Sequence, residues 1–121
     1  MTKLLAMAIP ILAGKTEQWK KFSKDLKTTH KKEFNESRKT LGVRERTFFQ
    51  STPMGDVIIV TLEGKNPQAA FEKFGQGKDE FTKWFVSQAK EVHGIDLSQK
   101  LSGSLPELVV ESEAIEEKVH A

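Results

Sequence analysis

The first apolar segment of the chain, residues 4–13, has apolar side chains on both sides of an extended backbone. Successive side chains of a strand point to opposite faces, so residues of the same parity lie together. One face carries Leu5, Met7, Ile9 and Ile11, and the other carries Leu4, Ala6, Ala8 and Leu12. We therefore predict a strand that is covered on both faces.

The spacing of apolar residues then changes from alternation to a helical period. Trp19, Phe22, Leu26 and Phe34 recur on one side of a helix. Thr16 is a suitable N-cap, with the acidic Glu17 in the first turn, and Gly42 is a suitable C-terminal stop. The pattern predicts one long amphipathic helix over residues 16–41.

Two β-prone segments follow, residues 43–51 and 57–63, and the turn-forming residues 52–56 between them predict a hairpin. A second helical region begins at Asn66-Pro67, is interrupted at residues 75–77, and resumes after Asp79 up to His93-Gly94. Residues 105–111 predict a last strand, where Pro106 is tolerable near the start or at an edge.

The order strand, helix, strand, strand, helix, strand predicts an α+β fold of the ferredoxin-like βαββαβ type. In this fold two helices cover one face of an antiparallel sheet. With 121 residues the chain has room for one domain, which we place at residues 1–112. Residues 113–121, with Glu113, Glu116 and Glu117, are predicted to form an acidic tail or a short terminal helix.

Two helices leave one face of the predicted sheet bare, and that face is apolar. On residues 57–62, Val57 and Ile59 oppose Ile58, Val60 and Leu62. An exposed patch of this kind exceeds what a monomer in solution normally tolerates. We predict a homodimer through the sheet face, which makes a dimeric α+β barrel; the alternative is a monomer whose loop and tail fold over that face.

The composition excludes several classes of protein. There is no cysteine, so a disulfide framework, a zinc–thiolate site and a cysteine nucleophile are excluded, and a reducing cytoplasm is the expected location. No apolar run approaches the roughly 18 residues of a membrane helix, so no membrane span is predicted. Leu4 to Ala13 has the length of a signal-peptide apolar region, but a single preceding Lys and the helix that follows favour a strand.

The net charge of +2 is unevenly distributed. Residues 1–40 hold ten Lys or Arg against four Asp or Glu, whereas the rest hold nine against thirteen. Lys20, Lys24, Lys27, Lys31 and Arg38 form a basic stripe on the first helix. A ferredoxin-like RNA binder would carry stacking aromatics on its central strands, and residues 57–63 have none. We interpret the stripe as a solvated face and predict no nucleic-acid partner.

Polar side chains also fall on the sheet-facing side of the first helix. At 100° per residue, His30 and Ser37 project within about 20° of Trp19, and Glu33 within about 40°. A His and a Glu on adjacent turns can exchange a proton, so His30 and Glu33 are candidate catalytic residues and Ser37 a candidate ligand contact. The alternative is a partly buried, satisfied histidine with Glu33 in solvent.

Two polar residues of the predicted hairpin complete this set. Arg46 and Gln50 share one face of the strand over residues 43–51, and Arg binds anions through its forked donors. We take both as candidate ligand-binding residues, with ion pairing between strands or subunits as the alternative. Gly14-Lys15-Thr16 lacks the earlier glycine of a phosphate loop, because Ile9 holds that position, and is interpreted as a turn.

Several short motifs resemble those of a known superfamily. They are Ile9 to Thr16, Ser37-Arg38, Leu41-Gly42, Gln50 to Asp56 and His93 to Leu97. Over residues 4–97 the chain resembles an uncharacterised bacterial family of the dimeric α+β barrel superfamily, which includes antibiotic-biosynthesis and haem-degrading monooxygenases. The motifs are mostly turns and caps. The resemblance implies a pocket between helices and sheet and makes Trp84 a further ligand-contact candidate.

Haem-degrading relatives use a helix histidine as the iron ligand and a nearby tryptophan against the ring. Nine residues of helix separate Trp84 from His93, a rotation of about 180°, so the two side chains would not face one cavity. His93 also precedes Gly94, where imidazoles commonly sit at helix ends. His30, His93 and His120 have no tight ligand spacing, so we predict neither haem nor any other cofactor or metal.

Two function classes follow. The first is a small-molecule site between helices and sheet, with cofactor-independent monooxygenase or isomerase activity as the enzymatic version. The second is a non-catalytic dimeric binding or interaction module. A cavity lined by His30 and Glu33 would favour the first class, and an interior filled with side chains would favour the second.

Overall fold

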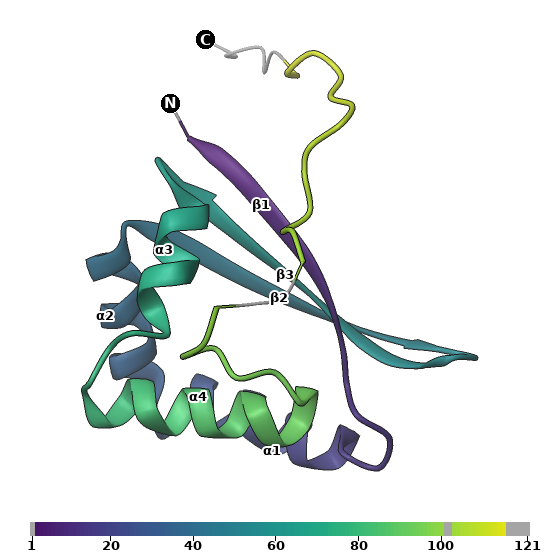
Figure 1. Cartoon of the computed structure of the whole chain (residues 1–121), viewed down its shortest axis with the longest axis vertical. Coiled ribbons are helices and arrows are strands. Elements are labelled where there is room, and N and C mark those ends of the chain that lie inside the picture. The colour runs from purple at the N-terminus through teal and green to yellow at the C-terminus, as the bar shows by residue number, and fades with distance from the viewer. Residues whose placement is uncertain (1, 101–102, 116–121) are drawn as a thin grey trace, which may run out of the picture.

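The computed structural model describes residues 2–100 and 103–115 and shows a small α+β fold. In this part of the chain a three-stranded antiparallel sheet is combined with four helices (Figure 1). The elements, in chain order, are β1 (Lys3–Pro10), α1 (Thr16–Lys27), α2 (Lys31–Leu41), β2 (Val43–Thr52), β3 (Gly55–Gly64), α3 (Pro67–Phe74) and α4 (Glu80–His93).

The sheet has the strand order β1-β3-β2. The predicted hairpin is present, because β2 and β3 pair antiparallel from Val43 opposite Gly64 to Thr52 opposite Gly55. β1 pairs antiparallel with the other edge of β3. The chain thus leaves β1, passes through α1 and α2, and returns as β2 on the far side of β3.

The two faces of this sheet have different environments. On what we call the inner face, Leu5, Met7, Ile58, Val60 and Leu62 are buried in the same core as Trp19, Phe22, Phe74 and Phe85. All four helices lie on this side of the sheet (Figure 1). The predicted grouping of Leu5 and Met7 on one face of β1 is confirmed.

The outer face of the sheet carries the side chains of opposite parity, in four cross-strand rows given by the pairing register. These rows are Leu4–Glu63–Arg44, Ala6–Thr61–Arg46, Ala8–Ile59–Phe48 and Pro10–Val57–Gln50. Leu4 is 59% exposed and Phe48 is 55% exposed. Within the described ranges no helix covers this face.

The predicted single helix over residues 16–41 is wrong, because it breaks between Lys27 and Lys31. The Thr28 hydroxyl donates to the Lys24 carbonyl at 2.8 Å, and the His30 amide donates back to Asp25 at 2.8 Å. β-branched Thr28 and Thr29 are poor helix interior residues, and a threonine hydroxyl competes for backbone carbonyls. The chain therefore turns here and starts α2 in a new direction.

The predicted last strand over residues 105–111 is also absent. In the described part of the chain these residues are irregular, and β1 has β3 as its strand neighbour. Pro106 lacks an N–H donor, which weakens strand pairing at this point. The element order is consequently β-α-α-β-β-α-α, in place of βαββαβ.

The helix start at Asn66-Pro67 and the cap at Asp79 are as predicted. Asn66 Oδ1 accepts from the Ala69 amide at 3.0 Å, and Asp79 Oδ2 accepts from the Thr82 amide at 3.1 Å. Thr16 is an exception, since Lys15 occupies the N-cap position and the Thr16 hydroxyl donates to Asp56 at 2.5 Å. No helix in the described ranges is long and apolar enough to cross a membrane.

Candidate functional site

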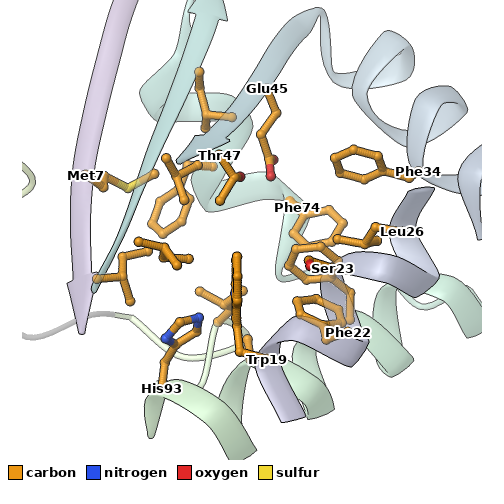
Figure 2. A pocket seen from close by; sticks show the side chains of 18 of the residues that line it. Met7, Trp19, Phe22, Ser23, Leu26, Phe34, Glu45, Thr47, Phe74 and His93 are labelled. Atoms are coloured by element: carbon orange, nitrogen blue, oxygen red, sulfur yellow. The ribbon is translucent and has the colours of Figure 1, made fainter. Parts of the chain in front are cut away.

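A cavity of about 340 Å³ lies between the inner face of the sheet and the helices (Figure 2). Its walls are mainly apolar and come from strands as well as helices. The apolar lining includes Met7, Trp19, Phe22, Leu26, Phe74 and Phe85, and the polar lining includes Ser23, Arg38, Glu45, Thr47 and His93. An apolar pocket with a few polar groups is the usual form of a small-molecule site.

A buried ion pair forms one end of the cavity. Arg38 Nε on α2 donates to Glu45 Oε1 on β2 at 2.8 Å, and both side chains are only 9% exposed. Arg38 Nη1 also donates to the Ser37 hydroxyl at 3.0 Å. Burying two charges is costly unless they are paired and hydrogen-bonded, so this pair ties α2 to the sheet.

Aromatic rings surround the guanidinium group of Arg38. Its central carbon lies 4.8 Å from the ring centre of Phe34, 4.3 Å from that of Phe74 and 5.0 Å from that of Phe85. Cation–π contacts of this kind gain strength when they are shielded from water. The hydrogen bond uses one oxygen of Glu45, and the described residues supply no donor to the other, Oε2. Glu45 thus retains an acceptor at the cavity.

His93 lies at the other end of the cavity, with Trp19 between it and Glu45 (Figure 2). Its Nδ1 is 2.9 Å from the Pro10 carbonyl oxygen, which can only accept, so Nδ1 carries the proton and donates. Burial lowers the pKa of His93, and the hydrogen bond to Pro10 opposes this only in part. The neutral ring presents an unprotonated Nε2.

An aromatic stack closes part of the wall towards solvent. The rings of Trp19 and Phe49 are 5.5 Å apart with an interplanar angle of 21°. Trp19 is buried, whereas Phe49 is 40% exposed and lines the cavity as well. Phe49 is therefore the part of this wall that can move with least loss of packing.

The predicted pair His30 and Glu33 is adjacent in space but lies outside the cavity lining. His30 Nδ1 is 3.1 Å from Glu33 Oε1, and the imidazole stacks on Trp84 of α4 with ring centres 4.0 Å apart. The prediction that His30 faces the sheet is wrong, because the break before α2 turns it towards α4. Trp84 packs on Phe22 at 5.3 Å between ring centres and does not line the cavity either.

The other predicted site residues are scattered. Ser37 reaches the cavity only through its hydrogen bond with Arg38. Arg46 lies on the outer face, 51% exposed at its side chain, with Nη2 3.9 Å from Glu63 Oε1. Gln50 is an exposed residue of the same face. The six candidates therefore do not form one site in the described structure.

The sequence reading missed the polar residues that do line the cavity. The prediction that Arg38 belongs to a solvated basic stripe is wrong, because Arg38 is 8% exposed. A signal was present, since Arg38 follows the apolar Phe34 by one helical turn and shares its face. Glu45, likewise, has the parity of Phe49 on β2. His93 was predicted to lie on a different side from Trp84, and only His93 of the two lines the cavity.

Within the described ranges, no three His, Asp or Glu side chains come together as a metal site would require. Comparison of the chain with protein-family models gives no match. Comparison with curated proteins and with solved structures gives none either. The resemblance to the dimeric α+β barrel superfamily accordingly stays a prediction.

Proposed function

We propose that the chain binds a small, largely apolar molecule in the cavity between the inner face and the helices. The observation that carries this proposal is the cavity itself, about 340 Å³ with apolar walls and charged or polar groups at its ends. Packed protein interiors seldom keep spaces larger than a water molecule. A space of this size in the core is therefore a candidate binding site.

The two ends of the cavity define the chemistry of the ligand. Glu45 Oε2 is an acceptor without a donor among the described residues, and Nε2 of neutral His93 is a second acceptor. A ligand that donates a hydrogen bond would satisfy one of them. We infer a ring-sized apolar molecule with a hydroxyl or amine group.

A direct test uses 1-aminoanthracene, an apolar amine whose fluorescence rises in apolar surroundings. We expect saturable binding by the full chain. Ser23→Phe, which places a large side chain in the cavity lining, should reduce the affinity at least tenfold. Ser87→Phe is the matched control, because Ser87 is exposed on α4 and does not line the cavity.

Circular dichroism would show whether each variant is folded. Absence of saturable binding by the unaltered chain would contradict the proposal. Equal affinity in folded Ser23→Phe and Ser87→Phe would contradict the location. Absence of binding would favour the alternative function, a non-catalytic dimeric interaction module.

We also infer that two copies associate through the outer face of the sheet. Ala8, Ile59 and Phe48 form an apolar row across its centre, and Leu4 lies 59% exposed near one end. A two-fold axis would place this row against its own copy without any other partner. Burial of such a row favours association because apolar area is removed from water.

Sedimentation velocity at micromolar concentration tests this inference. We expect a dimer for the unaltered chain and a monomer for Ala8→Arg, which puts a charge in the middle of the apolar row. Ala69→Arg adds the same charge at an exposed position of α3 and should remain dimeric. A monomeric unaltered chain would refute the homodimer.

A further inference from the structure

After α4, the described part of the chain includes an apolar segment that is largely exposed. Residues 103–115 are irregular, and neighbouring Leu108, Val109 and Val110 are 68%, 77% and 84% exposed. Valine and leucine in this order favour a strand. No backbone hydrogen bond joins residues 105–111 to another described residue. We call residues 105–111 the arm.

The arm leaves its own sheet soon after it begins, since Leu105 is partly buried against the core and Leu108 is exposed. A groove of about 910 Å³ is lined on one side by Lys3, Leu4 and Leu5 of β1 and on the other by residues 103–107. The first residues of the arm, 105–107, therefore lie beside the beginning of β1. Figure 1 shows it continuing past this end of the sheet, away from the helices. Beyond the groove, Leu108, Val109 and Val110 are left exposed by their own copy.

β1 meanwhile has one unpaired edge in the described structure, since β3 is its strand neighbour. An open edge is a template for another strand unless charges or bulges guard it. From Leu4 to Pro10, β1 carries no charged residue. The other edge of the sheet belongs to β2, where Arg44, Glu45 and Arg46 are consecutive. The β1 edge is thus the less protected of the two.

We propose that the arm of one copy adds as a fourth, antiparallel strand to the β1 edge of a second copy. This rests on the proposed homodimer. The arm has seven residues and β1 has eight, so the two match in length. In the antiparallel direction, acidic Glu111 and Glu113 lie near Lys3, and Pro106 lies at the strand start, where proline is tolerated. Each arm thus covers apolar residues that the second copy leaves exposed at its β1 edge.

Because the chain contains no cysteine, engineered cysteines report this pairing without background. One preparation carries Ala6→Cys in β1, and others carry Glu107→Cys, Val109→Cys or Glu111→Cys in the arm. Differently tagged preparations are mixed, allowed to exchange subunits and oxidised. Opposed strand residues fall within the Cα separation that a disulfide requires. We expect a mixed disulfide dimer for one arm position and at least fivefold less for the others.

Ala69→Cys on exposed α3 replaces Ala6→Cys in the control and should give no such preference among the arm positions. Cross-linking within one chain, in a variant carrying Ala6→Cys and the arm cysteine together, would overturn the exchange. Equal, weak cross-linking at all arm positions would overturn it too. A third outcome is a dimeric unaltered chain that Ala8→Arg makes monomeric, with no cross-link between the arm and Ala6→Cys. In that case the arm proposal fails and the homodimer stands. A monomeric unaltered chain refutes both.

Discussion

The inner and outer faces of the sheet carry the same kind of ion pair in opposite environments. Glu45 and Arg46 are neighbours on β2 and point to different faces. Arg38 and Glu45 lie 2.8 Å apart with both side chains 9% exposed, whereas Arg46 and Glu63 lie 3.9 Å apart and are 51% and 45% exposed. Charge pairing is therefore a structural requirement on the inner face and a minor contribution on the outer face.

The largest expected effect comes from breaking the inner pair. Arg38→Met should lower the free energy of unfolding by about 3–5 kcal/mol, because it leaves Glu45 buried without a partner. Arg46→Met removes the same group from the exposed pair and should cost about 1 kcal/mol or less. Urea denaturation of both variants measures the difference.

The double variant Arg38→Met/Glu45→Met distinguishes the loss of the ion pair from the cost of burying an unpaired charge. Replacing both charges with apolar groups removes the desolvation penalty, so much of the lost stability should return. Equal costs for Arg38→Met and Arg46→Met would show that the two pairs are equivalent and that the comparison of the faces is wrong.

A second comparison uses the neighbouring phenylalanines of β2. Phe49 has the inner-face parity and stacks on Trp19, and Phe48 lies on the outer face, 55% exposed. Phe49→Ala should cost about 1–3 kcal/mol, less than a fully buried phenylalanine, because Phe49 is already 40% exposed. Phe48→Ala should leave the stability of a separated protomer within about 0.5 kcal/mol.

Phe48→Ala should instead weaken self-association, measured by sedimentation across a dilution series. Unfolding is compared at concentrations below the dissociation constant, so that association does not add to stability. A loss of protomer stability in Phe48→Ala as large as that in Phe49→Ala would mean that the outer face belongs to the core of a single chain.

Features that depend on neighbouring residues were predictable from the sequence. The shared face of Leu5 and Met7 on β1, the β2–β3 hairpin, the helix start at Asn66-Pro67 and the Asp79 cap follow from local preferences, and the structure contains them. The break between α1 and α2 was not predicted, because an apolar period continues through Thr28 and Thr29 while their hydroxyl and β-branch chemistry opposes the helix.

Features that depend on distant residues were harder to predict. Residues 105–111 have strand composition, but a strand also needs a neighbouring strand edge to pair with. Composition does not show where the preceding loop places these residues relative to such an edge. Sequence periodicity places Arg38 on an exposed stripe, because it does not show that Glu45 and three aromatic rings contact the guanidinium group of Arg38. The position of the cavity between helices and sheet was expected, whereas its polar lining depended on these long-range contacts.

The smallest effect concerns His93, at the end of the cavity opposite the Arg38–Glu45 pair. Burial holds the pKa of His93 below its usual 6.5, so the folded chain resists a proton that the unfolded chain accepts. This contribution to stability is fully present above pH 6.5 and is lost as the pH falls towards the lower pKa of the folded state. His93→Gln should flatten that part of the stability curve, measured by urea denaturation between pH 7.5 and about pH 5.

The same curve of stability against pH distinguishes the effect of His93 from that of the carboxylates, which act at more acidic pH. Hydrogen bonds from Thr16, Thr82 and Ser98 lower the pKa values of Asp56, Asp79 and Asp96 below 3.8. Their contribution is present above that value and disappears only in stronger acid, so His93→Gln should leave it unchanged. One pKa unit corresponds to about 1.4 kcal/mol, which sets the scale of the difference. Parallel curves for the variant and the unaltered chain between pH 7.5 and about pH 5 would mean that His93 is as well solvated in the fold as in the unfolded chain, and that this end of the cavity is open to water.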